Sequence, residues 1–459
     1  MARRIALFGG SFNPPGLHHL RIAEVLAANF DEVRVVPCGP RPDKPEVYSV
    51  PPVFRAALCD LTFGTLERAV VDLFDLEQET FTRSHALETR YAPLGEVWHV
   101  VGADWLSGGA RGMSAIHTGW EKGSEMWVTS RFAVLARPGH ALEPGDLPPN
   151  HLLLSVDFPG SSTEIRDSLL HQRTTEHLLT DRAHRYINRY GLYRGTNPAT
   201  WSPGSLQGQK CMVHTDTRNG KSMHWVQRFE EHLTWTDPDF IVALGGDGAM
   251  LRCIREFWRQ RLPFFGVNAG HVGFLMNAPE PVFESSFPPA DVIFRQLPLL
   301  YVEMEAPDGT LTTAYAFNDA WVERSTSQSA WLEIRVNGIP RLPKLVSDGA
   351  LVSTAAGSTA YARAMGAAPL LADTPAWLLV GSNVLEPAHW KSALLSTDTL
   401  VEITNLDCDK RPVVAYVDGI AQGRVRTFRA RLSRAATAEL VFLANRDMAE
   451  KIAGIQFMR

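Results

Sequence analysis

Two short apolar segments that each run directly into a cluster of glycines constrain the fold of this chain more than any other feature. Residues 5–8 lead into Gly9-Gly10-Ser11, and residues 240–244 lead into the sequence Gly-Gly-Asp-Gly at 245–248. Glycines at such a point let the backbone turn sharply and approach a phosphate group closely. Each junction therefore predicts a strand–turn–helix unit that binds its ligand at the carboxyl end of a parallel strand.

Further apolar segments extend this pattern along the chain. In the first part they alternate with helical patterns, which favours a parallel sheet. From about residue 297 onward the pattern changes to short alternating strands, which favours an antiparallel domain. We therefore expect an α/β fold: a Rossmann-like domain, a second α/β domain and an all-β, sandwich-like domain. The expected strands include residues 5–8, 33–37, 97–101, 132–136, 210–213, 240–244, 331–336 and 413–417.

The length and a Pro-, Gly- and Ser-rich segment predict where the domains end. The 459 residues correspond to about three domains at roughly 150 residues each. Residues 196–208 have the composition of a linker. We predict a first domain over residues 1–195, an α/β domain over 209–295 and a β-rich domain over 296–435.

Charge and cysteine content exclude several classes of protein. The 45 basic and 50 acidic residues give a net charge of −5, and no basic run suggests a nucleic-acid partner. The five cysteines form no CxxC pair, which argues against a disulfide framework and a cysteine zinc site. The N-terminal apolar segment is too short for a signal peptide, and no run approaches the ~18 residues of a membrane helix. We expect a cytoplasmic protein without a membrane partner.

The first glycine turn carries a candidate phosphate site. His18 and His19 follow it at the start of an expected helix, where unpaired N–H groups and the helix dipole favour an anion. A histidine there can donate to phosphate oxygens as charge develops during transfer. On these residues alone, a plain strand-to-helix turn with two surface histidines is the simpler interpretation.

Three later segments carry polar groups suited to a nucleotide. Gly102-Ala103-Asp104 ends one expected strand, where a carboxylate can hold a ribose or an amide. Arg137 follows another strand, and residues 161–166, SSTEIR, open a helix with capping serines and an arginine. Taken singly, these segments also fit a turn aspartate, a loop arginine and a helix cap.

Taken together and in this order, six motifs resemble bacterial nicotinate-nucleotide adenylyltransferase over residues 3–194: GGSFNPP, HL, GAD, RPG, SSTEIR and YGLY. The resemblance implies that a mononucleotide phosphate attacks the α-phosphorus of ATP, with Mg²⁺ and charge neutralisation assisting. It implies a catalytic role for His19. The implied ATP and mononucleotide contacts are Gly9, Gly10, Ser11, Phe12, His18, Lys44, Thr82, Gly102, Asp104, Trp120, Arg137, Ser161, Ser162, Ile165 and Arg166.

The chain departs from this family at the histidine pair. The family pattern HxGH aligns with residues 16–19, where Gly16 replaces the first histidine and His18 replaces the internal glycine. The eukaryotic branch of the family also lacks the first histidine. Two hypotheses follow for this half: an active adenylyltransferase, or a non-catalytic module that binds nucleotides or mediates assembly.

The second glycine turn surrounds one carboxylate. Three glycines around Asp247 suit a nucleotide that lies close to the backbone, with the carboxylate able to accept a proton from a sugar hydroxyl. The same four residues also make a good structural turn, and lipid kinases carry a similar sequence.

Four more segments resemble NAD kinase over residues 209–459: NxGxxGFL at 268–275, ND at 318–319, DG at 348–349 and GSTAY at 357–361. The resemblance implies that Asp247 activates the adenosine 2′-hydroxyl of NAD for attack on the γ-phosphorus of ATP. It also implies homo-oligomers and a segment, 436–459, that returns to the α/β domain. The implied NAD contacts are Gly246, Gly248, Arg252, Asn268, Phe274, Asn318, Asp319, Asp348, Thr359, Ala360, Tyr361 and Ala364.

The two resemblances together imply a bifunctional enzyme whose partners are small nucleotides: ATP, a pyridine mononucleotide and NAD. One activity makes a dinucleotide and the other phosphorylates one. A nicotinate substrate would give an acid dinucleotide that a separate enzyme must amidate, whereas a nicotinamide substrate would give NAD directly. The resemblance favours nicotinate, and the sequence leaves both open.

Overall fold

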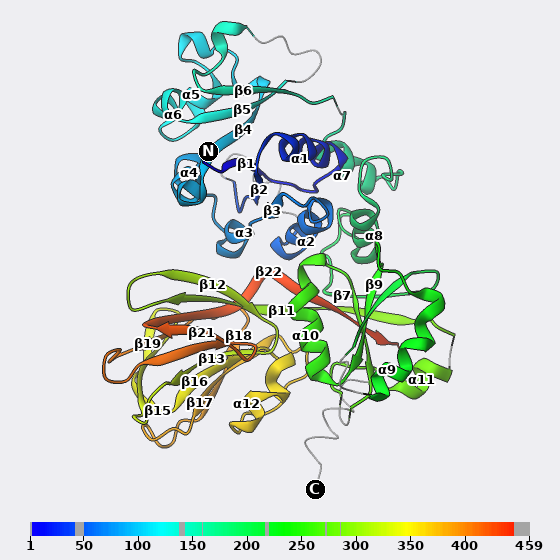
Figure 1. Ribbon diagram of the computed structural model, residues 1–459, viewed down its shortest axis with the longest axis vertical. Coiled ribbons are helices and arrows are strands. Elements are labelled where there is room, and N and C mark those ends of the chain that lie inside the picture. The colour runs from blue at the N-terminus through cyan, green and yellow to red at the C-terminus, as the bar shows by residue number, and fades with distance from the viewer. Residues whose placement is uncertain are drawn as a thin grey trace. The chain divides into compact units, whose positions relative to one another are not determined.

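The computed structural model describes residues 2–41, 50–136, 143–157, 159–215, 220–270, 273–284 and 286–444. The chain divides into two compact units, Met1–Pro198 and Ala199–Arg459, and Figure 1 labels their elements. A parallel sheet in the first unit and mixed and antiparallel sheets in the second confirm the predicted fold class. Within the described ranges, no helix is long and apolar enough to cross a membrane.

The first unit is built on a six-stranded sheet in the order β3-β2-β1-β4-β5-β6, with every neighbouring pair parallel. The chain leaves β1 toward β2 and later returns to its other side as β4. Ligands of such sheets bind at this switch point, outside the carboxyl ends of the strands. The strands are β1 (Arg4–Gly10), β2 (Glu32–Pro37), β3 (Ala69–Val71), β4 (Glu96–Gly102), β5 (Arg131–Ala136) and β6 (His151–Ser155).

Helices connect these strands, and three of them share one hydrophobic core. Phe54 of α2, Ile165 of α7 and Ile187 of α8 are all buried in this cluster. The hydroxyl groups of Ser161 and Thr180 accept backbone N–H bonds at the starts of α7 and α8. The helices are α1 (Leu17–Asn29), α2 (Pro52–Phe63), α3 (Phe74–Gln78), α4 (Ser84–Tyr91), α5 (Ala115–Gly119), α6 (Gly123–Thr129), α7 (Ser162–Leu170) and α8 (Asp181–Tyr190).

Three parallel strands and the helices around them form the α/β part of the second unit. Ile241 and Ala243 of β9 pack with Met250 of α10 on one face of the sheet, while Val242 and Phe229 pack on the other. This alternation reflects the two-residue period of a strand whose two faces are both covered. The elements are β8 (Cys211–Thr215), α9 (Gly220–Val226), β9 (Phe240–Gly245), α10 (Asp247–Phe257), β10 (Phe264–Asn268) and α11 (Pro279–Glu284).

One long strand, β22 (Thr427–Leu443), joins this parallel part to the antiparallel part of the same ten-stranded sheet. Along one side β22 pairs antiparallel with β11 (Val292–Glu305). On its other side it pairs with β19 at its beginning and, in parallel, with β10 at its end. The predicted return of the chain to the α/β domain thus lies within β22, and residues 445–459 are outside the described ranges.

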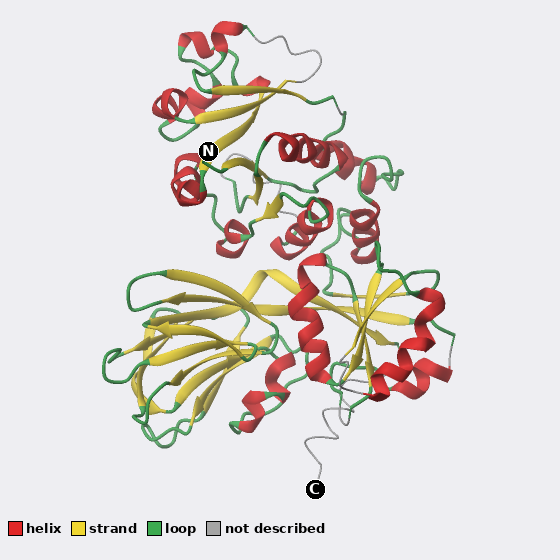
Figure 2. Ribbon diagram, in the orientation of Figure 1, coloured by secondary structure: helices red, strands yellow, loops and turns green. Residues whose placement is uncertain are grey.

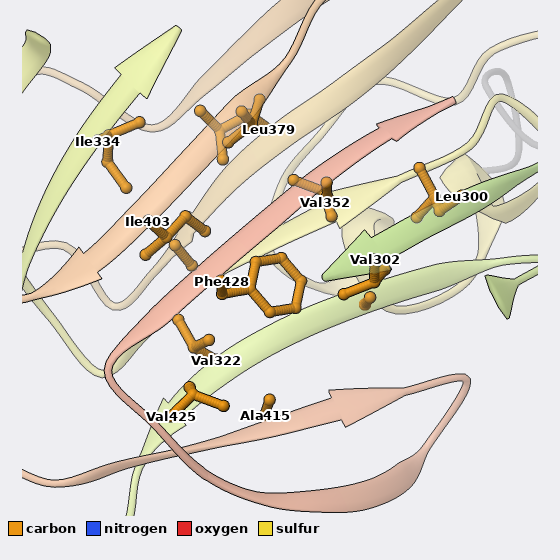
Figure 3. Packing of buried hydrophobic residues seen from close by; sticks show 14 of the residues in the cluster. Leu300, Val302, Val322, Ile334, Val352, Leu379, Ile403, Ala415, Val425 and Phe428 are labelled. Carbon is orange, nitrogen blue, oxygen red and sulfur yellow. The ribbon is translucent and has the colours of Figure 1, made fainter. Parts of the chain in front are cut away.

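A second, six-stranded antiparallel sheet completes the β-rich part, in the order β18-β17-β16-β13-β20-β21. Side chains of both sheets, such as Val302, Val352 and Phe428, meet in one core (Figure 3), and strands dominate this part in Figure 2. The remaining elements are β12 (Leu311–Ala316), β13 (Asp319–Arg324), β14 (Ala330–Val336), β15 (Ile339–Ser347), β16 (Gly349–Ser353), α12 (Tyr361–Ala364), β17 (Ala376–Ser382), β18 (Ser392–Ser396), β19 (Val401–Asn405), β20 (Val413–Val417) and β21 (Ile420–Val425).

The segment predicted as a linker, residues 196–208, is largely part of the second unit. The two units divide at Pro198, and β7 (Trp201–Gly204) pairs antiparallel with β11. Leu206, just beyond it, is fully buried in a hydrophobic cluster. Proline is tolerated in β7 because edge strands need not donate every backbone N–H. Composition alone therefore predicted too long a linker.

Candidate active sites

A cavity of about 440 Å³ lies at the switch point of the first sheet. Seven of the residues predicted from separate motifs line it together: Gly9, Gly10, His19, Thr82, Gly102, Asp104 and Trp120. The two glycine segments end β1 and β4, which is why these residues reach the same edge of the sheet. Lys44 and Arg137, also predicted here, lie outside the described residues.

His19 is oriented by the start of α1. The backbone N–H of Gly16 donates to His19 Nδ1 at 3.2 Å, so a neutral His19 ring carries its proton on Nε2. Phe12 packs edge-to-face against this ring, with ring centroids 5.1 Å apart. Phe12 is itself buried, and it holds the histidine in place without lining the cavity. His19 thus presents a hydrogen-bond donor beside the glycine turn.

The exchange of Gly16 and His18 relative to the family pattern has a steric consequence. A Cβ atom on Gly16 would lie 2.6 Å from Ile165 Cδ1 and 2.9 Å from two atoms of the His18 ring. The His18 ring is buried and lies tilted by 41° against that of His19, with ring centroids 3.9 Å apart. The ring of His18 therefore occupies the space that a side chain at position 16 would need.

The SSTEIR segment holds the loop that follows β1. Ser162 Oγ donates to the carbonyl of Pro14 at 2.8 Å, and Arg166 Nη1 donates to that of Asn13 at 2.7 Å. Arg166 lines a separate cavity of about 510 Å³. Ile165 is fully buried in the hydrophobic core, so its position does not support the predicted ATP contact. The SSTEIR segment therefore holds the loop after β1 in place through the backbone carbonyl groups of Asn13 and Pro14.

Thr82 is tied to a buried carboxylate on the cavity wall. Its Oγ1 donates to Asp75 Oδ1 at 2.6 Å, and its backbone N–H donates to Asp75 Oδ2 at 3.2 Å. Burial raises the pKa of Asp75, against the effect of these hydrogen bonds. Asp75, which the sequence analysis did not single out, therefore positions Thr82, the predicted substrate contact.

Arg55 is a further residue that no motif indicated. It is buried, and its guanidinium donates twice to the carbonyl of Ser11, at 2.6 and 3.2 Å, and once to that of Cys38, at 2.7 Å. Such a cation beneath the glycine turn both fixes the loop and favours an anion above it. The one available signal was an arginine within the mostly apolar segment that forms α2.

In the second unit, Asp247 connects two of the predicted motifs. It is the first residue of α10, and Gly246 alone separates it from β9. Its Oδ2 accepts the backbone N–H of Phe274 at 3.0 Å, and its Oδ1 accepts that of Leu275 at 2.8 Å. Each carboxylate oxygen keeps a further lone pair for a ligand. The glycine turn and the NxGxxGFL segment therefore form one site.

The NxGxxGFL segment depends on its glycines. Asn268 Oδ1 accepts the backbone N–H of Gly270 at 2.9 Å. Gly273 has φ +65°, and a Cβ atom there would lie 2.5 Å from the Asn268 side chain. The close approach of Gly273 to Asn268 thus explains why this turn needs a residue without a side chain.

A second group of predicted residues is organised by Asp418, which the sequence interpretation missed. The Asp418 carboxylate accepts backbone N–H groups from Phe317, Asn318 and Asp319 at 2.7 to 3.3 Å. Its carbonyl accepts a bond of 3.2 Å from Arg255 of α10. The Asp-Gly pair at 418–419, between two strands, signalled a hairpin turn but not this contact.

Asn318 and Asp319 retain polar groups suited to a ligand. Burial, with a further contribution from Asp418, raises the pKa of Asp319 to about 7. Asn318 Oδ1 is buried and accepts no hydrogen bond from any described residue. The backbone of Asn318 packs against Gly357, where a Cβ atom would lie 2.1 Å from the Asn318 carbonyl oxygen. The motifs at 318–319 and 357–361 are therefore in contact.

Asp348 lies apart from this group. Asn383 and Arg324 bind its carboxylate at 2.8 and 2.5 Å, and both lower its pKa. Asp348 lies beside one end of β13, and Asp319 lies at the other end. The usual rise per residue of a strand puts these two residues roughly 16 Å apart. Two other predicted contacts, half-buried Arg252 and exposed Gly248, lie on α10. The exposed Tyr361 packs on Trp321. The remaining predicted contacts lie beside or within α12: Thr359, Ala360 and Ala364.

Comparison with known proteins finds a different family in each part of the chain. A family model described as cytidylyltransferase-like matches residues 7–168, and the model of the ATP-NAD kinase N-terminal domain matches residues 197–288. The NAD kinase of Rickettsia bellii is 30% identical over 246 residues, which cover 54% of this chain and 96% of that protein. That of Brucella suis is 35% identical over 230 residues, covering 49% and 88%.

Among solved structures, yeast NADH kinase complexed with NADH has a TM-score of 0.47 and 18% identity, covering 55% of this chain and 87% of that one. The sequence matches are decisive, because they span nearly the whole of each relative. The chain therefore belongs to the NAD kinase family and carries a cytidylyltransferase-like domain ahead of its kinase unit.

Proposed function

We propose that the chain catalyses two steps in the synthesis of pyridine dinucleotides. The first unit transfers the adenylyl group of ATP to nicotinate or nicotinamide mononucleotide and releases pyrophosphate. The second phosphorylates the adenosine 2′-hydroxyl of NAD with ATP. The observation that carries the first activity is the convergence of seven predicted residues on one cavity at the sheet's switch point.

In the adenylyl transfer, a phosphate oxygen of the mononucleotide attacks the α-phosphorus of ATP, and the bond to pyrophosphate breaks. His19 Nε2 and the N-terminus of α1 donate to oxygens that gain charge in the transition state. No cluster of three or more metal-binding side chains occurs among the described residues. Mg²⁺ would enter with the ATP phosphates and would supply charge neutralisation there.

In the phosphorylation, Asp247 accepts the proton of the 2′-hydroxyl while the oxygen attacks the γ-phosphorus and ADP leaves. The N–H groups of Phe274 and Leu275 hold the carboxylate in one orientation. Asn318 Oδ1, which is buried and without a described donor, is suited to accept a bond from the dinucleotide. Phosphorylation of a diacylglycerol in place of NAD would contradict this assignment.

The test is a chromatographic assay of the full-length chain with ATP and Mg²⁺. Nicotinate mononucleotide, nicotinamide mononucleotide and NAD are supplied in separate reactions. NADP formed from nicotinamide mononucleotide would mean that the two units carry out both reactions without another enzyme. Acid dinucleotide formed only from nicotinate mononucleotide would mean two activities separated by an amidation step.

A different outcome would contradict the first activity. If neither mononucleotide gives a dinucleotide while NAD becomes NADP, the first unit is a non-catalytic nucleotide-binding module. The substitution at Gly16 would then be the first cause to examine. A homo-oligomer is expected through the kinase unit, and light scattering of the purified chain measures it.

A further inference from the structure

A buried arginine contacts the backbone at the ends of two neighbouring strands of the first sheet. Arg55 of α2 is only 2% exposed. Its Nε and Nη2 both donate to the carbonyl of Ser11, just after β1, and Nη2 also donates to that of Cys38, just after β2. Cys38 lines the 440 Å³ cavity, and so does Gly10, the residue before Ser11. The guanidinium therefore binds backbone that belongs to the cavity wall or adjoins it.

The positive charge of Arg55 lacks a negative partner within the described ranges. Its three hydrogen bonds go to neutral carbonyl oxygens, and no described carboxylate forms an ion pair with it. An arginine side chain stays protonated in proteins. Buried charges are usually paired with an opposite charge, because their removal from water is costly. Two carbonyl groups offset only part of that cost, so an anion bound at the glycine turn would stabilise this arginine further.

The charge of Arg55 acts on groups that line the cavity. Burial raises the pKa of the Cys38 thiol, and Arg55 opposes that rise. Arg41, which also lines the cavity, acts in the same direction as Arg55, and Asp75 acts against it. Burial raises the pKa of Asp75, which weakens its repulsion of an anion. Glu79 shares a small cavity with Arg55 but is exposed, so water screens its charge.

We propose that Arg55 is a positioning residue for adenylyl transfer, which fixes the glycine turn and supplies a buried positive charge that favours binding of the ATP phosphates there. This inference rests on the reaction proposed above for the first unit. Arg166 holds the same loop through the carbonyl of Asn13, but it is only half-buried. Because buried charges are screened less than exposed ones, Arg55 contributes more to the potential at the turn.

The experiment separates the charge of Arg55 from its hydrogen bonds in the full-length chain. Arg55→Gln keeps N–H donors and removes the charge, whereas Arg55→Lys keeps the charge and loses the forked set of donors. The KM for ATP in adenylyl transfer should rise about tenfold or more in Arg55→Gln and stay within about threefold of the wild type in Arg55→Lys. Arg55→Met, also neutral, serves if Arg55→Gln does not fold.

Arg68→Gln is the matched control. Arg68 also donates to two backbone carbonyls, those of Ala27 and Phe30, but it is exposed and lies near the start of β2, away from the glycine turn. This variant should leave the KM for ATP unchanged. If Arg55 only held the fold together, Arg55→Lys would raise the KM as much as Arg55→Gln and lower Tm equally. That result would overturn the proposal.

Hydrogen exchange of residues 9–20, with and without inorganic pyrophosphate, separates this inference from the proposed function. Pyrophosphate should slow exchange there in the wild type and in Arg55→Lys, but not in Arg55→Gln. If this pattern holds while the wild type forms no dinucleotide, the proposed reaction fails and the role of Arg55 in phosphate binding stands. If turnover occurs and the protection is equal in all three proteins, the reaction stands and the role of Arg55 is wrong. Absence of protection in the wild type would overturn the inference in either case.

Discussion

At the scale of single residues, the start of α1 shows how one exchange of positions affects two side chains. Gly16 lacks a Cβ atom, and the ring of His18 fills the adjoining space. A histidine could return to position 16 only if His18 gave up that space. The two positions are therefore expected to be coupled in stability.

The first prediction concerns this coupling. Gly16→His alone should lower the free energy of unfolding of the first unit by about 1–3 kcal/mol, the usual cost of overpacking. The double variant Gly16→His/His18→Gly should recover most of that loss, because the remaining contact is the flexible end of Ile165. Urea unfolding of the full-length variants measures both. A double variant no more stable than the single one would argue against the coupling.

The second prediction concerns the pH dependence of the kinase unit. Burial and then Asp418 raise the pKa of Asp319 from its ordinary value of 3.8 to about 7. Between these values the folded chain binds more protons than the unfolded chain, so Asp319 makes stability fall as pH rises through that range. Asp319→Asn should reduce this dependence, measured as Tm between about pH 5 and pH 8.

Asp308→Asn is the control for this measurement. Backbone and side-chain hydrogen bonds of Thr310 lower the pKa of Asp308, which is exposed in a turn and therefore stays ionised over the same range. Its substitution should leave the slope unchanged. An identical slope for Asp319→Asn and the wild type would show that Asp319 does not titrate as inferred.

At the scale of elements, the parts predictable from the sequence are those with local causes. The turns from β1 to α1 and from β9 to α10 follow from glycines beside short apolar strands. The strand β7 was missed because its pairing partner, β11, lies about ninety residues later. Asp418 was missed for the same reason, since it binds a backbone N–H 101 residues away.

The third prediction concerns Asn277, which joins β10 to β22. Its side-chain amide donates to the carbonyls of Gly266 and Val441, and its carbonyl accepts the N–H of Leu443, all at 2.9 to 3.0 Å. Asn277→Leu leaves these buried groups unsatisfied and should cost about 2–4 kcal/mol of unfolding free energy. Gln422→Ala, at an exposed position with one hydrogen bond to a backbone carbonyl, should cost under about 1 kcal/mol in the same urea titration.

At the scale of the whole molecule, each unit contains its own sheets, hydrophobic clusters and candidate site. The two activities are therefore expected to respond separately to substitution.

The fourth prediction tests this separation in the full-length chain. His19→Ala should lower adenylyl transfer by about 10²–10³-fold and leave NAD phosphorylation near the wild-type rate. Asp247→Asn should lower NAD phosphorylation by about 10²–10⁴-fold and leave adenylyl transfer intact. Both rates are measured on each variant. Loss of both activities from either single change would mean that the sites depend on each other.

The position of β22 has a consequence for how the protein emerges from the ribosome. All six strands of the first sheet have been synthesised by Ser155, whereas the strand between β10 and β11 is complete only at Leu443. Until then, the nascent kinase unit exposes unpaired strand edges, which favour aggregation. A premature stop before Thr427 would therefore remove the middle of a sheet, and would release a finished first unit attached to an unfolded second one.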